Sequence, residues 1–292
     1  MSLSKTKVEE SDIIEELDCG SILQHGKFND RIYLIKTGKD YSVSLPDKLV
    51  QKAAQNGYSK IFGKVPINRL PEFIGAGYQI EAYIPRFYDG KTDAFMLGYY
   101  LKKERFTEAN VDKLDEIRKT AVSQAKNSLN NFDSEKFKIR NCNPDDSVEM
   151  AKIYQEVFAT YPFPIHKAEY IKETMEDNVN YFCVESKSDN QILAIASAEQ
   201  DLSVFNAEMT DFATLPQWRG NGFAGHLLNA MEDFLFEKSI KTFYTIARAE
   251  SYGMNITFAK CGYKFGGRLK NNTNISGEIE SMNIWYKNFN IK

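Results

Sequence analysis

Cysteine and histidine are scarce in this chain of 292 residues, which contains four cysteines and three histidines. Cys19, Cys142, Cys183 and Cys261 lie far apart in the sequence, so no CxxC pair exists for zinc binding or redox chemistry. With so few histidines to add ligands, the sequence predicts no metal site. Isolated cysteines are typical of small buried side chains in a reducing compartment, and we therefore expect a cytoplasmic protein.

A surplus of basic residues is also missing, because Lys and Arg number 37 against 40 Asp and Glu, for a net charge of −3. Residues 1–135 hold 20 basic and 20 acidic side chains, and residues 136–292 hold 17 and 20. Nucleic-acid-binding proteins usually present a basic surface, so no nucleic-acid partner is expected. No apolar run approaches the roughly 20 residues of a membrane span, and the polar N-terminal stretch lacks a secretory core, so no membrane partner is expected either.

Hydrophobic residues make up 42% of the chain and aromatic residues 13%, which excludes a disordered protein. The length suggests two domains or one large one. Residues 1–25 are expected to form a peripheral arm of an N-terminal α/β domain over 1–103. Apolar residues at helical spacing from Val111 to Leu129 predict a long connecting helix within 104–134, and a second domain follows over 135–292.

The second half has a regular order of predicted elements. A strand at 137–141 is followed by two helices around a proline-rich loop, and then by three strands, the first two of which form a hairpin. A glycine-rich loop, a helix, a strand, a short helix and two strands complete the order. The hairpin argues against the doubly wound dinucleotide-binding fold, although Gly220, Gly222 and Gly225 satisfy its GxGxxG pattern.

The stretch Gln217-Trp218-Arg219-Gly220-Asn221-Gly222 carries the clearest chemical signal. Glycines at a strand-to-helix turn let the backbone approach a ligand closely, and the first amides of the following helix point at that ligand. The helix dipole and the charge of Arg219 favour an anion, so this stretch predicts a pyrophosphate site.

This stretch, in this order of elements, resembles the GNAT superfamily of CoA-dependent N-acetyltransferases, whose pyrophosphate loop reads Q/R-x-x-G-x-G/A. The resemblance covers a little over half of the chain. It implies an α/β (α+β) fold with a mixed, mostly antiparallel sheet flanked by helices. It also implies acetyl-CoA as cosubstrate, without a metal. The implied acetyl-CoA contacts are Phe212, Ala213, Thr214, Gln217, Arg219, Gly220, Asn221, Gly222, Phe223, Ala224, Ser251, Asn255 and Phe258.

Acyl transfer to an amine needs a base, because only about one alkylamine in 10³ is unprotonated at pH 7. Glu208 lies early on the strand before the glycine loop, where GNAT enzymes often carry a base glutamate, and is the favoured catalytic residue. Asp211 and Glu199 are the alternatives. Strand alternation predicts that Glu208 and Thr210 share one face, and that Met209 and Asp211 share the other.

The resemblance departs at the general acid. The last helix of many members reads N-x-x-A-x-x-L-Y-x-K-x-G-F, and Phe258 stands where their proton-donating tyrosine would be. Either a displaced hydroxyl, from Ser251 or Tyr252, donates the proton, or the thiolate leaves unprotonated. Asn255 is expected to contact the CoA arm.

The first half repeats part of the second. Residues 46–101 have the predicted order of 222–288, which is helix, strand, helix, Gly-Tyr, strand, turn, strand. We hypothesise that the N-terminal domain is a truncated GNAT-like half, which lacks the glycine loop and does not bind CoA. Chance agreement of short units is the alternative.

Over the whole chain the sequence resembles the β-lysine N-acetyltransferases, which make the osmolyte Nε-acetyl-β-lysine. The shared runs are 75–85, 87–90, 161–165 and 209–214. The resemblance implies a small diamino acid as acceptor. Tyr161 and Phe163, on the loop between the first two helices, and Glu199 are the expected substrate contacts, and Arg86 or Arg248 would meet its carboxylate.

Together these resemblances imply an acetyl-CoA-dependent N-acetyltransferase, whose acceptor, the side-chain amine of β-lysine, attacks the thioester directly. One alternative is transfer to another small amine, such as a polyamine or lysine. Another is a non-catalytic acetyl-CoA sensor, because Phe258 cannot donate a proton. The oligomeric state is left open, with a homodimer as one alternative.

Overall fold

The computed structural model describes residues 12–38 and 42–289. Its N-terminal half begins with the strands β1 (Ile13–Glu16), β2 (Ile22–Gly26) and β3 (Arg31–Lys36). It continues with α1 (Leu45–Gln55), β4 (Lys60–Pro66), a 3₁₀ turn (Ile67–Arg69), α2 (Leu70–Gly75), β5 (Gln79–Tyr88) and β6 (Thr92–Tyr100). Two helices, α3 (Lys103–Phe106) and α4 (Val111–Ser123), then lead into the C-terminal half.

The C-terminal half begins with β7 (Phe137–Asn141), a 3₁₀ turn (Pro144–Asp146), α5 (Ser147–Val157), α6 (Ala168–Glu176), β8 (Val179–Ser186), β9 (Ile192–Asp201) and β10 (Asn206–Thr214). After the glycine loop come α7 (Phe223–Glu237), β11 (Thr242–Arg248), α8 (Tyr252–Lys260), β12 (Lys264–Ile275) and β13 (Glu278–Asn288). The order of elements expected over 137–288 is therefore confirmed.

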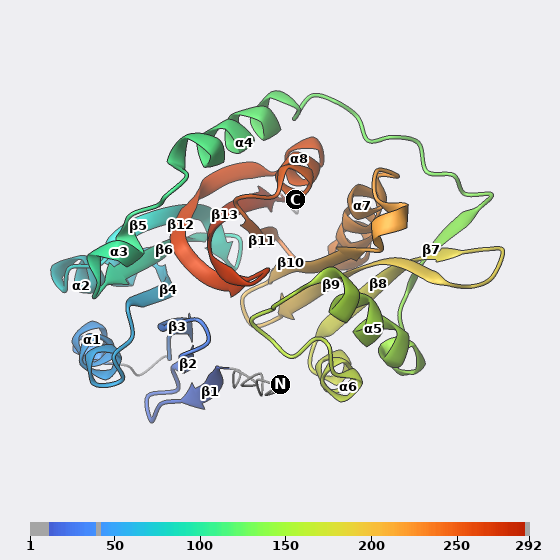
Figure 1. Ribbon diagram of the computed structural model, residues 1–292. Helices are drawn as coiled ribbons and strands as arrows, with labels where there is room; N and C mark the ends of the chain where they lie inside the picture. The colour runs from blue at the N-terminus through green and yellow to red at the C-terminus, as the bar shows by residue number, and fades with distance from the viewer. Residues whose placement is uncertain (1–11, 39–41, 290–292) are drawn as a thin grey trace, which may run out of the picture.

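The described strands form one open sheet in the order β1-β2-β3-β4-β6-β5-β12-β13-β11-β10-β9-β8-β7. Figure 1 shows the N-terminal half-sheet on the left, in blue and cyan, and the C-terminal half-sheet on the right, with β12 and β13 between them. Pairing is antiparallel except between β3 and β4 and between β10 and β11. The expected mixed, mostly antiparallel sheet flanked by helices is confirmed.

Helices cover both faces of the C-terminal half-sheet and create its two cores. Leu227, Leu228 and Met231 of α7 are fully buried against one face. On the other face, α5 and α6 bury residues such as Met150 and Ile171. Within residues 12–38 and 42–289, no helix is both long enough and apolar enough to cross a membrane.

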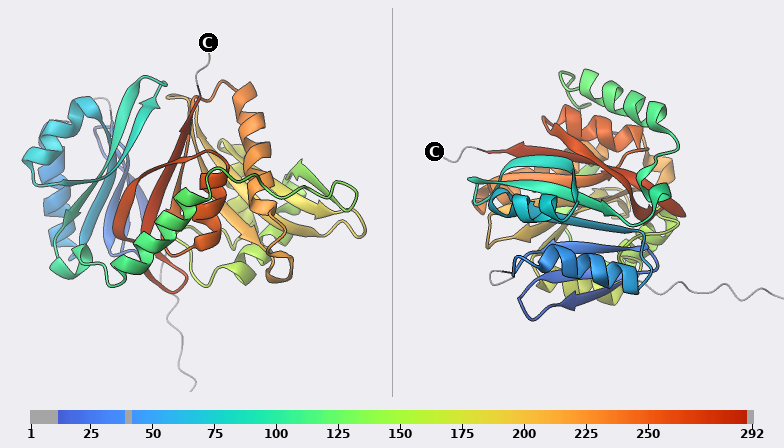
Figure 2. Two further views of the ribbon diagram at one scale, coloured as in Figure 1. Left: turned by 90° about the horizontal axis from the view of Figure 1, so that it is seen from above. Right: turned by 90° about the vertical axis from the view of Figure 1, so that its left-hand side faces the viewer.

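Two sequence-based expectations about the connections are wrong. Of the arm expected over 1–25, residues 1–11 lie outside the described residues, and residues 12–25 belong to the sheet, because β1 and β2 pair with each other and extend it beyond β3. The connecting helix is also shorter than predicted, since α4 ends at Ser123 and the asparagine-rich stretch that follows is not helical. Figure 2 shows α4 lying along α8, where Leu114, Ile117 and Ala121 are buried.

The two half-sheets share a pairing scheme. In the N-terminal half β4 is parallel to β3 and antiparallel to β6, which pairs with β5. In the C-terminal half β11 is parallel to β10 and antiparallel to β13, which pairs with β12. Each scheme is built around the same helix–strand–helix–strand–strand order.

The halves meet where β5 approaches β12, with Ala82 opposite Gly267. A side chain at Gly267 would place its Cβ 2.3 Å from the carbonyl oxygen of Glu81, so only glycine allows this approach. Beside it, the Nζ of the fully buried Lys60 lies 2.9 Å from a Glu81 carboxylate oxygen and donates to the carbonyl of Lys270 at 2.8 Å. Glu81 in turn accepts from the amide of Lys270. A buried ion pair therefore ties the N-terminal half-sheet to β12.

We expect Glu81→Gln to lower the free energy of unfolding by about 3–5 kcal/mol, because it leaves the Lys60 ammonium buried without its counter-ion. Urea unfolding of the two proteins measures this difference. The matched control is Glu250→Gln, which breaks the exposed Lys113–Glu250 pair and should cost much less. Equal losses in the two variants would contradict a special role for the buried pair.

Candidate active site

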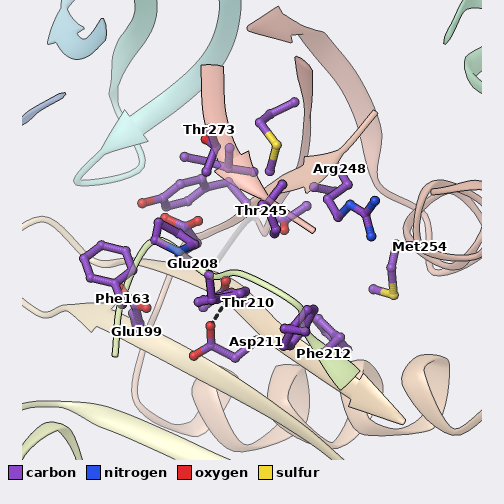
Figure 3. Close-up of a pocket in the computed structure, with 18 of the residues that line it drawn as sticks. Phe163, Glu199, Glu208, Thr210, Asp211, Phe212, Thr245, Arg248, Met254 and Thr273 are labelled. Carbon is purple, nitrogen blue, oxygen red and sulfur yellow. Dashed lines mark hydrogen bonds between the residues drawn. The ribbon is translucent and has the colours of Figure 1, made fainter. Parts of the chain in front are cut away.

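A cavity of about 970 Å³ lies between the two halves of the molecule (Figure 3). On one side it is lined by alternate residues of β3 and β4, and on the other by residues of β10 and β11. The glycine loop and α8 line one end, and the loop between α5 and α6 lines another part of the wall. One continuous space thus joins the predicted cosubstrate loop to the predicted catalytic strand.

The strand β10 is broken by a bulge beside this cavity. Its register against β9 shifts between Thr210 and Ala213, and Asp211 adopts a left-handed conformation with φ of +53°. Pairing with β11 is confined to 206–208, so the two strands separate beyond that point. The bulge turns Asp211 into the cavity beside Thr210 and Phe212. The predicted alternation of faces is therefore wrong beyond Thr210.

The glycine loop forms a turn at the start of α7. Gly220 and Gly222 have φ of +86° and +75°, a conformation that other residues adopt only with strain, and Gly222 caps the helix. The first amides of α7 have no acceptor within the helix. Arg219 lines the cavity, and its Nε donates to the carbonyl of Thr214 at 3.4 Å. The loop has the donors, the dipole and the charge that suit a pyrophosphate.

The structure brings most of the predicted acetyl-CoA contacts to the cavity. The lining includes Phe212, Thr214, Arg219, Gly220, Gly222, Phe223, Ala224, Ser251 and Phe258. It does not include Ala213, Gln217, Asn221 and Asn255.

The side chain of Asn255 forms four hydrogen bonds within the protein. Its side-chain nitrogen donates to the carbonyls of Arg248 and Ser251, and its side-chain oxygen accepts from Asn283 and Trp285. These bonds link the start of α8 to β11 and β13. The side chain is fully buried and has no group turned to the cavity, which differs from the expected contact with the CoA arm.

The residues around the expected general acid differ in their surroundings. Phe258, which has no hydroxyl group, lies where the proton-donating tyrosine was expected, with its ring centroid 5.6 Å from that of Phe212. Tyr252 points away from the cavity and donates to Glu116 on α4. Ser251 lines the cavity while its Oγ accepts from the Met254 amide. Thr257 of α8 also lines the cavity and carries a hydroxyl group, and the sequence analysis did not identify it as a candidate proton donor.

Glu199 and Glu208 face each other across the pair β9–β10. Residues directly opposite in an antiparallel pair project from the same face, and both side chains line the cavity (Figure 3). Partial burial raises the pKa of the half-buried Glu208, and partial desolvation together with repulsion from Glu208 and Asp211 raises the pKa of Glu199, which is exposed to the cavity. This arrangement favours holding a proton or a cation between the two groups.

Asp211 is already engaged by neighbouring hydroxyls. It accepts from Tyr161 at 2.5 Å and from Ser197 at 2.6 Å. Burial raises the pKa of Asp211, although both hydrogen bonds favour its charged form. Asp211 thus holds Tyr161 in place. Tyr161 and Phe163 both line the cavity, as does Tyr170 of α6.

The N-terminal half contributes residues that the sequence reading missed. Arg31 and Tyr33 on β3, and Phe62 and Lys64 on β4, line the cavity. The Nζ of Lys64 donates to the hydroxyl of Tyr244 at 2.8 Å. Alternation in the strand Arg31-Ile32-Tyr33-Leu34-Ile35 would have grouped Arg31 with Tyr33, but nothing local showed what that face meets.

The two arginines nominated for a substrate carboxylate do not serve that role well. Arg86 does not line the cavity. Arg248 does, but its Nε and Nη2 donate to Glu280 at 3.0 and 2.6 Å. A bidentate pair of this kind occupies the edge of the guanidinium that a second carboxylate would need.

The fold and the cavity define a transferase of the acetyl-CoA-dependent class, and comparison with known proteins agrees. Residues 148–263 match the acetyltransferase (GNAT) family. The chain is 38% identical over 271 residues to the β-lysine N(6)-acetyltransferase of Methanococcus maripaludis, covering 91% of this chain and 96% of the relative.

Two further relatives extend the comparison. The β-lysine N(6)-acetyltransferase of Methanosarcina mazei is 36% identical over 77% of this chain and 90% of its own length. The N-acetyltransferase YodP of Bacillus subtilis is 30% identical over 91% of this chain and 95% of its own length. The protein belongs to the GNAT family and is an N-acetyltransferase.

The carboxyl cluster predicts a pH dependence of stability. The folded-state pKa values of Glu199, Glu208 and Asp211 are raised, so the folded protein binds more protons than the unfolded chain at pH values between the ordinary and the raised pKa. The free energy of unfolding should therefore fall as pH rises through this window. Glu199→Gln should flatten that fall, measured by urea unfolding between about pH 4 and 8. The same slope in both proteins would contradict the expectation.

Proposed function

We propose that this enzyme transfers the acetyl group of acetyl-CoA to the side-chain amine of β-lysine. Two relatives named for this reaction resemble the chain at 38% and 36% identity, and the first match extends over 91% of it. The similarity thus includes the N-terminal half, which lines the acceptor end of the cavity. The observation that carries the proposal is the pair of opposed carboxylates, Glu199 and Glu208, where the sheet separates.

The residues of the loop fit acetyl-CoA, which supplies the activated acetyl group when bound. Arg219 and the amides of 220–224 would hold the pyrophosphate. The edge of β10 at Phe212–Thr214, which is no longer paired with β11, would lie beside the pantetheine arm. Phe258 packs edge-on against Phe212 and closes the apolar side of this path.

Glu208 is the base in this proposal. The acceptor arrives as an ammonium ion and must lose a proton. Glu208 lines the cavity beside the bulge, and its raised pKa brings its proton affinity nearer to that of an amine. Glu199 opposite it attracts the ammonium form. Asp211 acts as a positioning residue through Tyr161 rather than as a base, because neighbouring hydroxyls already donate to both of its oxygens.

The loop between α5 and α6 completes the acceptor site. Tyr161 and Phe163, together with Tyr170, bring aromatic side chains next to the carboxylates. Aromatic faces and carboxylates together attract alkylammonium groups. We further propose that the N-terminal domain is a truncated GNAT-like half, which forms one wall of the cavity and does not bind a second CoA. Its shared pairing scheme supports the proposal.

We expect purified protein to release thiol from acetyl-CoA fastest with β-lysine in a panel of β-lysine, lysine, ornithine and spermidine. Thiol release is followed with a chromogenic disulfide, and the product is identified by mass spectrometry. Faster turnover of spermidine than of any amino acid would contradict β-lysine as acceptor and favour a polyamine.

Glu208→Gln should lower kcat by about 10²- to 10⁴-fold, because an amide cannot take the proton of the amine. Acetyl-CoA affinity should be kept, since Glu208 lies outside the loop. Calorimetric titration with acetyl-CoA checks the second part. As a comparison, Asp211→Asn should lower activity through misplacement of Tyr161, and Tyr161→Phe should reproduce part of its loss. Unchanged kcat in Glu208→Gln would eliminate this base.

A further inference from the structure

Arg31 is a buried cation without a counter-ion. Only 4% of the surface of this residue is exposed. Its Nη1 donates to the carbonyl of Asn272 and, at 3.0 Å, to the hydroxyl of Thr273, both on β12. Within residues 12–38 and 42–289 it forms no ion pair, and its buried Nε has no hydrogen-bond partner. Burying a charge in this way is costly unless an anion joins it.

The surroundings of Arg31 add positive charge. Arg105 is also buried and donates to the same Asn272 carbonyl and to the carbonyl of Asn29. Asp12 acts on Arg31 through its charge, and its oxygens accept from Phe28 and Asn29, while Asp30, Asp12 and Glu81 act on Arg105. Burial and the charge of Arg105 lower the pKa of Arg31 to about 10, which leaves it charged at neutral pH. Arg31 thus has an acidic residue in its surroundings but no carboxylate in direct contact.

Arg31 lines the cavity, whereas Arg105 does not. The cavity is also polarised. The N-terminal wall presents Arg31 and Lys64, whereas the C-terminal wall presents Glu199 and Glu208. Lys64 already donates to Tyr244 and lies over the rings of Tyr33 and Tyr244.

We infer that Arg31 binds the carboxylate of the acceptor and thereby makes the enzyme select an amino acid over a simple diamine. This inference rests on the proposed acetyl transfer to a diamino acid. Nη1 is held by β12, and the buried Nε has no hydrogen-bond partner. A guanidinium can pair with both oxygens of one carboxylate through its Nε and Nη2 groups. With the carboxylate there, the cationic end of the acceptor faces Glu199 and Glu208.

The test compares each amino acid with the diamine that remains after loss of its carboxylate. The pairs are β-lysine with 1,4-diaminopentane, lysine with 1,5-diaminopentane, and ornithine with 1,4-diaminobutane. The quantity measured is the ratio of kcat/KM within each pair, for the unaltered enzyme and for Arg31→Met. We expect Arg31→Met to lower kcat/KM for the preferred amino acid by roughly 10- to 100-fold and to leave that of its diamine nearly unchanged. Arg31→Lys should restore part of the preference.

The matched control is Arg105→Met, which removes a buried arginine from the same Asn272 carbonyl but not from the cavity. It should lower thermal stability while keeping the ratio within each pair. Thermal unfolding of every variant shows whether Arg31→Met is folded.

Thr273→Val supplies a milder variant, because it removes the hydroxyl that accepts from Arg31. We expect it to lower the ratio of kcat/KM for the amino acid to that for its diamine less than Arg31→Met does.

The outcomes separate this inference from the proposed function. If lysine or ornithine replaces β-lysine as the best acceptor, the proposed substrate is wrong, but Arg31→Met must still abolish the preference for the acid. If the unaltered enzyme prefers the diamine in every pair, the inference is overturned even though acetyl transfer persists. It is also overturned if Arg31→Met lowers kcat/KM equally for both members of the preferred pair.

Discussion

The bulge at Asp211 is the feature on which the proposed active site depends. A left-handed residue in β10 shifts the register of this strand against β9, and beyond Glu208 the strand no longer pairs with β11, which leaves a strand edge beside the glycine loop. The same distortion turns the carboxylate of Asp211 inward, where it holds Tyr161 and Ser197. One local break in the sheet therefore opens the cosubstrate path and fixes one wall of the acceptor pocket.

Around this break the carboxylates of the cavity come from the C-terminal half, and the N-terminal half contributes cations to the facing wall. The C-terminal half supplies the carboxylates and the glycine loop, and the N-terminal half supplies Arg31, Lys64 and aromatic rings. The Lys60–Glu81 pair and the close approach at Gly267 keep the halves in one register. The N-terminal half thus supplies part of the wall of the cavity.

Much of the fold was predictable because its signals are local. Turn chemistry, helical periodicity and strand alternation each act over a few residues, and they placed the elements of 137–288 correctly. Errors arose where distant contacts decide the outcome. The helix expected to reach Leu129 ends at Ser123, although Gln124, Ala125 and Lys126 directly after it are good helix formers. The strand β2 pairs with β3 and β1 pairs with β2, and these partners were not evident from the sequence of 12–26 itself.

The sequence by itself determined the glycine loop, the order of elements and the family, because each is a short-range pattern at fixed spacing. Only the tertiary structure decided which side chains share the cavity. Asn255 proved to be a buried link between α8 and β13, while Arg31, 241 residues from Asn272 in the chain, proved to line the cavity. Such groupings depend on how sheets curve and where a strand bulges, and these follow from packing across the whole molecule rather than from any single stretch.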